Sequence, residues 1–100
     1  MEQPRNIVGA EVRRLRDAKG LSQQAVASRV AVLGYDLTRG TLAKIEAGIR
    51  AVSDVELFLL ARALNVEVTA LYPKNTIQLM KRGQLQPFHT RSKKQRKLKG

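Results

Sequence analysis

Apolar residues near the N-terminus recur at the three- and four-residue spacing of an amphipathic helix. Val8, Val12 and Leu15 would lie on one face of such a helix. Gly20 follows, and glycine is the usual left-handed residue that ends a helix. The pattern predicts a first helix at about residues 6–19.

The next three predicted helices share one start signal. An apolar residue precedes a Ser or Thr, and a second apolar residue follows at the fourth helical position. The hydroxyl can accept a hydrogen bond from an unpaired amide, and the apolar pair can fix the entry angle. After Ser53, Glu56 completes a capping box. The three sets are Leu21, Ser22 and Val26; Leu37, Thr38 and Leu42; and Val52, Ser53 and Leu57, and they predict helices at 23–33, 39–47 and 54–64.

Stop signals follow each of these helices. Gly34 and Gly48 follow the second and third, and Asn65 follows the fourth. Residues 67–72 are predicted to form a short fifth helix. Pro73 closes it, because proline has no amide to donate and clashes with the preceding turn.

Length and composition agree with one small helical domain. The chain has 100 residues, of which 43% are hydrophobic but only 4% aromatic. A core of Leu, Val, Ile and Ala suits packed helices better than a sheet sandwich. We therefore predict an all-α domain at residues 1–73, followed by an extension at 74–89 and a flexible tail at 90–100.

The charge is concentrated at the C-terminus. Residues 1–73 hold 10 basic and 8 acidic residues, a net +2, whereas residues 74–100 hold 9 basic residues and no acid, a net +9. Such an excess favours a polyanionic partner, most commonly nucleic acid. The tail is predicted to be disordered when free and either to follow phosphates or to remain solvated. An anionic membrane would need an apolar anchor, and residues 90–100 offer only Leu98.

Several classes of site and location are disfavoured. The chain has no cysteine, which excludes disulfides, and His89 is its only histidine. The acids are scattered and no phosphate-binding glycine loop is present, so we predict no enzyme, metal or cofactor. The N-terminus lacks a secretory apolar run, and residues 55–64 are too short to span a bilayer. A cytoplasmic location is expected.

Three stretches resemble successive blocks of the lambda-repressor-like family, which includes phage repressors and Xre-type bacterial regulators. They are LRDAKGLSQQAVA (15–27), GTLAKIEAGIR (40–50) and VELFLLARALNV (55–66). The resemblance covers about residues 5–72. It implies a five-helix DNA-binding domain of bacterial or phage origin, acting as a sequence-specific transcriptional regulator, a repressor, that binds double-stranded DNA as a homodimer.

Two features depart from the family pattern. The segment between Ala27 and Leu42 is longer than in the compact phage repressors, and VAVLGYDLTRG suggests either a longer second helix or a wider turn. The usual proline after the third helix is also missing. The sequence there is GIRAVS, and Ser53 should still cap the fourth helix.

The resemblance implies that residues 39–47 form a recognition helix in the major groove, with its N-terminal residues toward base edges. Arg39, Gly40, Thr41 and Lys44 are the predicted base contacts. A glycine permits close approach, and an arginine can pair with guanine O6 and N7. Lys44 can reach either a guanine or a phosphate. The alternatives are solvated cations and a tolerated glycine.

Residues beside the recognition helix are predicted to contact phosphates. By resemblance, Gln23 should hydrogen-bond a phosphate at the start of its helix, where the helix dipole adds partial positive charge. Gln24 and Thr38 are further candidates. Arg50 is placed either to contact the flanking phosphate or to remain a solvated loop residue.

Two further roles are predicted. In the family, the positions of Arg16 and Glu46 form an ion pair that holds the recognition helix at its angle. A dimer contact is expected from apolar residues with no obvious core to fill, namely Leu71, Tyr72, Ile77, Leu79 and Met80.

Two other functions stay open. The chain could be a DNA-binding antitoxin whose residues 74–100 neutralise a toxin. It could also bind RNA or other polyanions generally, through its tail.

Overall fold

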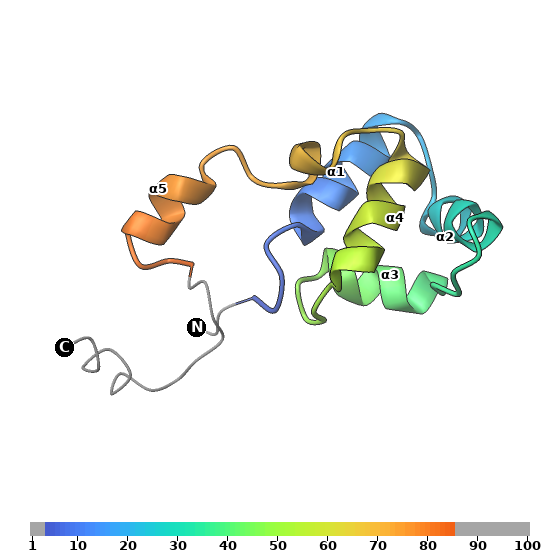
Figure 1. The fold of residues 1–100 in the computed structure, drawn as a ribbon, viewed down its shortest axis with the longest axis horizontal. Coiled ribbons are helices and arrows are strands. Elements are labelled where there is room, and N and C mark those ends of the chain that lie inside the picture. The colour runs from blue at the N-terminus through green and yellow to red at the C-terminus, as the bar shows by residue number, and fades with distance from the viewer. Residues whose placement is uncertain (1–3, 86–100) are drawn as a thin grey trace.

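The computed structural model describes residues 4–85, and every regular element in that part of the chain is helical (Figure 1). The predicted all-α fold is therefore confirmed. The predicted tail at 90–100 and the end of the extension lie outside the described residues. The elements are α1 (Gly9–Ala18), α2 (Gln23–Val32), α3 (Arg39–Glu46), α4 (Asp54–Leu64), a 3₁₀ turn η1 (Val68–Leu71) and α5 (Thr76–Lys81).

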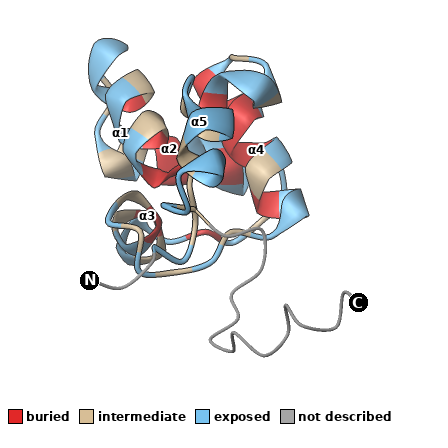
Figure 2. Ribbon diagram, turned by 90° about the vertical axis from the view of Figure 1, so that its left-hand side faces the viewer, coloured by how far each residue is buried: buried red, intermediate tan, exposed pale blue. Residues whose placement is uncertain are grey.

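The core lies between α1, α2, α3, α4 and η1, where the buried faces of the helices meet (Figure 2). Its largest fully buried side chains are all aliphatic. Leu42 and Ile45 of α3 point into it, so this short helix has one face fixed in the core and one face outward. The fully buried residues are Val12, Val26, Val30, Leu42, Ile45, Leu60, Leu64 and Leu71.

The three predicted start signals are used as caps. At each helix start a hydroxyl oxygen accepts a hydrogen bond from the amide three residues later, which satisfies one unpaired donor of the first turn. The capping box at the start of α4 is complete. The pairs are Ser22 with Ala25 at 3.0 Å, Thr38 with Thr41 at 3.1 Å and Ser53 with Glu56 at 3.1 Å.

The helices α1, α2 and α3 are each shorter than predicted, α3 by one residue at its end. The α1 helix begins at Gly9 because the side chain of Asn6 accepts from the amides of Val8 and Gly9, which makes a turn of the preceding residues. The α2 helix ends at Val32. Its extra residues therefore form a wider turn at 33–38 rather than a longer helix.

The chain after α4 differs most from the prediction. Asn65 ends α4 in the left-handed conformation, as expected. The predicted helix at 67–72 is only the short η1, and Leu71 within it is completely buried. Its assignment to a dimer contact was therefore wrong, because the side chain fills the core. The α5 helix lies to one side of the bundle and buries no residue (Figure 1).

None of the described helices is long and apolar enough to cross a membrane.

Candidate nucleic-acid interface

The outward face of α3 carries small and basic residues. Arg39, Gly40 and Lys44 are exposed and Thr41 is half-buried. Within residues 4–85, the side chains of Arg39 and Lys44 have no hydrogen-bond or ion-pair partner. The α3 helix lies along the lower edge of the bundle in Figure 1. The exposure of Arg39 and Lys44 shows that both side chains reach solvent. The geometry leaves both cations available to an external anion or acceptor.

The fold does not require a glycine at position 40. A methyl group built there would have only the Thr38 hydroxyl near it, at 3.9 Å. Glycine also weakens a helix relative to alanine by about 0.5–1 kcal/mol. Neither packing nor backbone conformation within the described part of the chain explains Gly40.

The predicted ion pair between Arg16 and Glu46 is present and nearly buried. The guanidinium Nε and Nη2 donate to the two carboxylate oxygens at 2.7 and 3.0 Å. Nη1 also donates to the carbonyl of Leu21 at 2.8 Å, and the bond to Glu46 raises the pKa of Arg16. This arrangement ties the C-terminal end of α3 to α1 and to the start of α2.

The predicted phosphate ligands Gln23, Gln24 and Thr38 stand at the starts of α2 and α3. Gln23 donates to Glu46 at 3.0 Å, so its amide belongs to the buried ion-pair cluster. Gln24 is exposed and donates to Ser28 at 3.2 Å. The Thr38 hydroxyl caps α3. These bonds orient the three side chains without burying them completely.

A second buried carboxylate, Glu56, lies in the first turn of α4 and binds residues on both sides of α3 in the sequence. Arg50 donates to both its oxygens at 2.9 Å, and the hydroxyl of Tyr35 donates at 2.6 Å. The amide of Ser53 adds a bond at 3.0 Å. The Arg50 guanidinium, with these other donors, outweighs burial and lowers the pKa of Glu56 to about 2.

This second cluster was not predicted from the sequence. Glu56 was recognised only as the capping-box acid, and Arg50 only as a phosphate ligand or solvated residue. Tyr35 belongs to the wide turn before α3, and Arg50 to the loop after it. The cluster therefore joins both connections of α3 to the start of α4.

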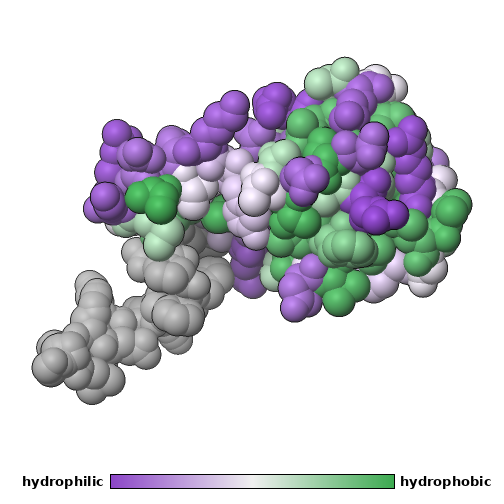
Figure 3. Space-filling view, turned by 45° about the horizontal axis from the view of Figure 1, so that its top comes forward, coloured by the Kyte–Doolittle hydropathy of each residue, from purple (hydrophilic) through white to green (hydrophobic). Residues whose placement is uncertain are grey.

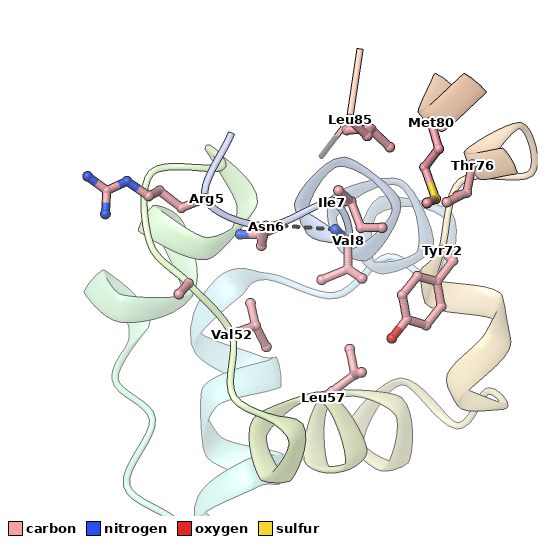
Figure 4. Close-up of a pocket in the computed structure, with 11 residues that line it drawn as sticks. Arg5, Asn6, Ile7, Val8, Val52, Leu57, Tyr72, Thr76, Met80 and Leu85 are labelled. Atoms are coloured by element: carbon pink, nitrogen blue, oxygen red, sulfur yellow. Dashed lines mark hydrogen bonds between the residues drawn. The ribbon is translucent and has the colours of Figure 1, made fainter. Parts of the chain in front are cut away.

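An apolar groove of about 310 Å³ lies on another side of the bundle (Figure 4). Ile7, Val52, Leu57, Tyr72 and Met80 contribute most of its hydrophobic wall. It runs between the segment before α1, the start of α4 and α5. Among residues 4–85, no group of three His, Asp or Glu residues is arranged to hold a metal ion.

Known proteins resemble the chain in sequence and structure. A sequence model described as helix-turn-helix matches residues 12–71. The restriction-modification controller protein C.AhdI from Aeromonas hydrophila is 38% identical, with a TM-score of 0.59, over 65% of this chain and 87% of its own. The clp gene regulator ClgR from C. glutamicum is 26% identical, with a TM-score of 0.61, over 82% of this chain and 95% of its own. A search of curated protein sequences gave no match.

Proposed function

The chain belongs to the lambda-repressor-like helix-turn-helix family of non-enzymatic, DNA-binding transcription regulators, and we propose that it is a repressor that reads an operator with α3. The observation that carries this proposal is the outward face of α3. That face combines two cations that have no partner among residues 4–85 with a glycine that the described fold does not need. A helix of this kind fits the major groove, which is about 12 Å wide.

The base contacts are assigned to the first half of α3. Arg39 pairs its guanidinium with the O6 and N7 atoms of a guanine, and Gly40 allows the helix to approach the base edges closely. Thr41 contacts a thymine methyl or a phosphate. Lys44, one turn further along, binds a guanine or the adjacent phosphate.

The phosphate contacts flank the base contacts. Gln23, Gln24 and Thr38 stand at helix starts, where unpaired amides and the helix dipole favour an anion. Arg50 uses one edge of its guanidinium for Glu56, and its side chain remains 36% exposed. We assign the exposed part to a flanking phosphate.

We also propose that the regulator acts as a homodimer on a two-fold operator, with half-sites about 34 Å apart. Hydrophobic surface remains on α5 and on the bundle beside it (Figure 3). Tyr72, Ile77 and Met80 are exposed and Leu79 is half-buried, which supports four of the five predicted dimer residues as surface positions. Exposed Val55 and Phe58 of α4 are additional candidates. Binding to chromosomal or phage DNA would place the protein in the cytoplasm.

The decisive experiment is selection of bound fragments from random and genomic DNA, repeated over a salt series. A regulator enriches one sequence pattern, and its affinity for that pattern exceeds its affinity for other DNA at every salt concentration. Binding with no enriched pattern, lost when residues 90–100 are deleted, would instead support general polyanion binding. Co-purification of a small protein encoded next door would support the antitoxin alternative.

A point substitution tests the assigned base contact. Arg39→Ala should cost about 1–3 kcal/mol on the selected operator and relax the preference at one base position. Arg13→Ala is the matched control, because Arg13 is a solvated arginine with only a long surface pair to Asp17 at 3.7 Å. Unchanged selectivity in Arg39→Ala would remove Arg39 from the interface.

A further inference from the structure

Asn6 joins the start of α1 to the end of α3 through one side chain. Its Oδ1 atom accepts from the amides of Val8 at 2.9 Å and Gly9 at 2.7 Å, which caps α1. Its Nδ2 atom donates to the carbonyls of Ile45 at 3.0 Å and Arg50 at 2.8 Å. The Asn6 side-chain amide therefore pairs two backbone N–H groups at the start of α1 and two backbone carbonyls in and after the last turn of α3.

Two backbone features surround this junction. The amide of Arg5 donates to the carbonyl of Gly48 at 2.8 Å, just beyond α3. At Gly9, an added methyl group would lie 2.2 Å from the Ile45 carbonyl oxygen, so the two backbones touch. Figure 4 shows Asn6 between Arg5, which points away from the apolar groove, and Val8, to which its bond is drawn. The segment before α1 is thus fastened to the C-terminal end of α3.

Only an amide side chain supplies this set of bonds at that position. Aspartate has acceptors and no donor, and serine is too short to reach both the α1 amides and the two carbonyls. The partial positive end of α1 also meets the partial negative end of α3, which favours the junction electrostatically.

We propose that Asn6 is a positioning residue that sets the angle of α3 and so the sequence discrimination of the protein, an inference that rests on the proposed DNA-reading function. The Asn6 bonds hold the C-terminal end of α3, whereas Arg39 begins the helix, about 10 Å away along its axis. A tilt of about 10° about the held end moves Arg39 by about 2 Å. That displacement breaks a bidentate base contact, whose hydrogen bonds tolerate only a few tenths of an ångström.

The test compares Asn6→Ser with Asn75→Ser on the intact chain. Asn75 is exposed and its side chain caps no helix, so it receives the same exchange without the same role. The readout is the ratio of affinities for the selected operator and a scrambled duplex, measured below the melting temperature of each variant. We expect Asn6→Ser to lower this ratio at least about tenfold, the discrimination of one bidentate contact. Affinity for scrambled DNA should change less than about twofold, and Asn75→Ser should match the wild type.

The outcomes separate the two proposals. A folded Asn6→Ser protein with the wild-type ratio would overturn the role of Asn6, whereas a wild-type chain without any sequence preference would overturn the proposed function. If Asn6→Ser does not fold at the assay temperature, Asn6→Asp is judged by the same ratio at a lower temperature, since it keeps the acceptor for α1 and replaces the donor to α3 with an oxygen that repels the two carbonyls.

Discussion

At the residue scale, Gly9 and Gly40 are the same amino acid in two different environments. Both lie in the first turn of a helix. At Gly9 a methyl group would collide with the Ile45 carbonyl, whereas at Gly40 it would meet almost nothing. The first glycine is required by close packing of two helices inside the protein. For the second, we propose that it permits the close approach of DNA.

The substitution Gly40→Ala should therefore separate stability from binding. We expect the free energy of unfolding to rise by about 0.5–1 kcal/mol, because alanine restricts the unfolded chain and favours the helix. Operator affinity should fall, because the added methyl group keeps α3 away from the base edges. Urea denaturation and DNA titration measure the two effects.

The control is Gly9→Ala, the same exchange in α1, which should lower stability because of the collision with Ile45. Operator binding by Gly40→Ala that equals or exceeds the wild type would show that position 40 does not face DNA.

At the element scale, α3 is a short helix anchored by two buried carboxylates, one at its C-terminal end and one that binds the segments before and after it. Glu46, its last residue, is bound by Arg16 and Gln23. Glu56 binds Tyr35 from the preceding turn and Arg50 from the following loop. Isolated helices of this length are not stable in water, so these anchors, the bonds from Asn6 to the Ile45 and Arg50 carbonyls and the core face together give α3 its fixed orientation.

The wide turn before α3 depends on the Tyr35 hydroxyl. We expect Tyr35→Phe to lower the free energy of unfolding, because the variant loses its hydrogen bond to the buried Glu56 carboxylate. Tyr72→Phe should change it by less than about 0.5 kcal/mol, because Tyr72 is at the surface and its hydroxyl has no partner among the described residues. Thermal or urea unfolding of the two variants makes the comparison, and equal losses would contradict it.

The Glu56 cluster also makes stability depend on pH. Its folded pKa is about 2, below the ordinary value of 4.5, so the cluster stabilises the protein when the pH lies above the unfolded pKa. The contribution is on the order of 3 kcal/mol near neutral pH, and about 2 kcal/mol of it should be lost by about pH 3.

Urea unfolding at about pH 6 and pH 3 tests this sign. Wild type should lose stability on acidification, and Glu56→Gln should start less stable and lose less over the same range. Parallel losses in both proteins would show that Glu56 is not the titrating group.

At the scale of the whole molecule, two features lie outside the proposed recognition helix. The first is the hydrophobic surface of α5, whose Ile77 is 61% exposed and Met80 43% exposed. The second is the concentration of positive charge toward the C-terminus. Residues 1–73 carry a net charge of +2, whereas residues 74–100 carry +9. We propose that the first contacts a second copy of the chain and that the second raises affinity for any DNA.

Sedimentation of the free protein at micromolar concentration tests the dimer. Ile77→Glu should weaken dimerisation at least about tenfold, because a two-fold interface would bury the new charge twice. Val32→Glu is the matched control, since Val32 is 85% exposed at the end of α2, away from α5. A wild-type chain that stays monomeric with and without operator would contradict the proposed dimer.

Local signals in the sequence determined the presence of α1 to α4 and the starts of α2, α3 and α4. Ser22, Thr38 and Ser53 cap as predicted, because a cap needs only a hydroxyl within a few residues of an amide. The periodic apolar residues determined that α3 has a buried face and an exposed face. The resemblance to the family predicted the ion pair of Arg16 and Glu46, two residues that are thirty positions apart in the sequence.

The tertiary structure decided the features that depend on contacts between distant segments. Leu71 enters the core instead of a dimer surface, Arg50 binds Glu56, and Asn6 reaches the end of α3. The sequence shows whether each of these side chains is polar or apolar, but it does not show which residue each one contacts. The environment of each side chain is created only when helices far apart in the chain come together, because burial and hydrogen-bond geometry are properties of that assembled arrangement.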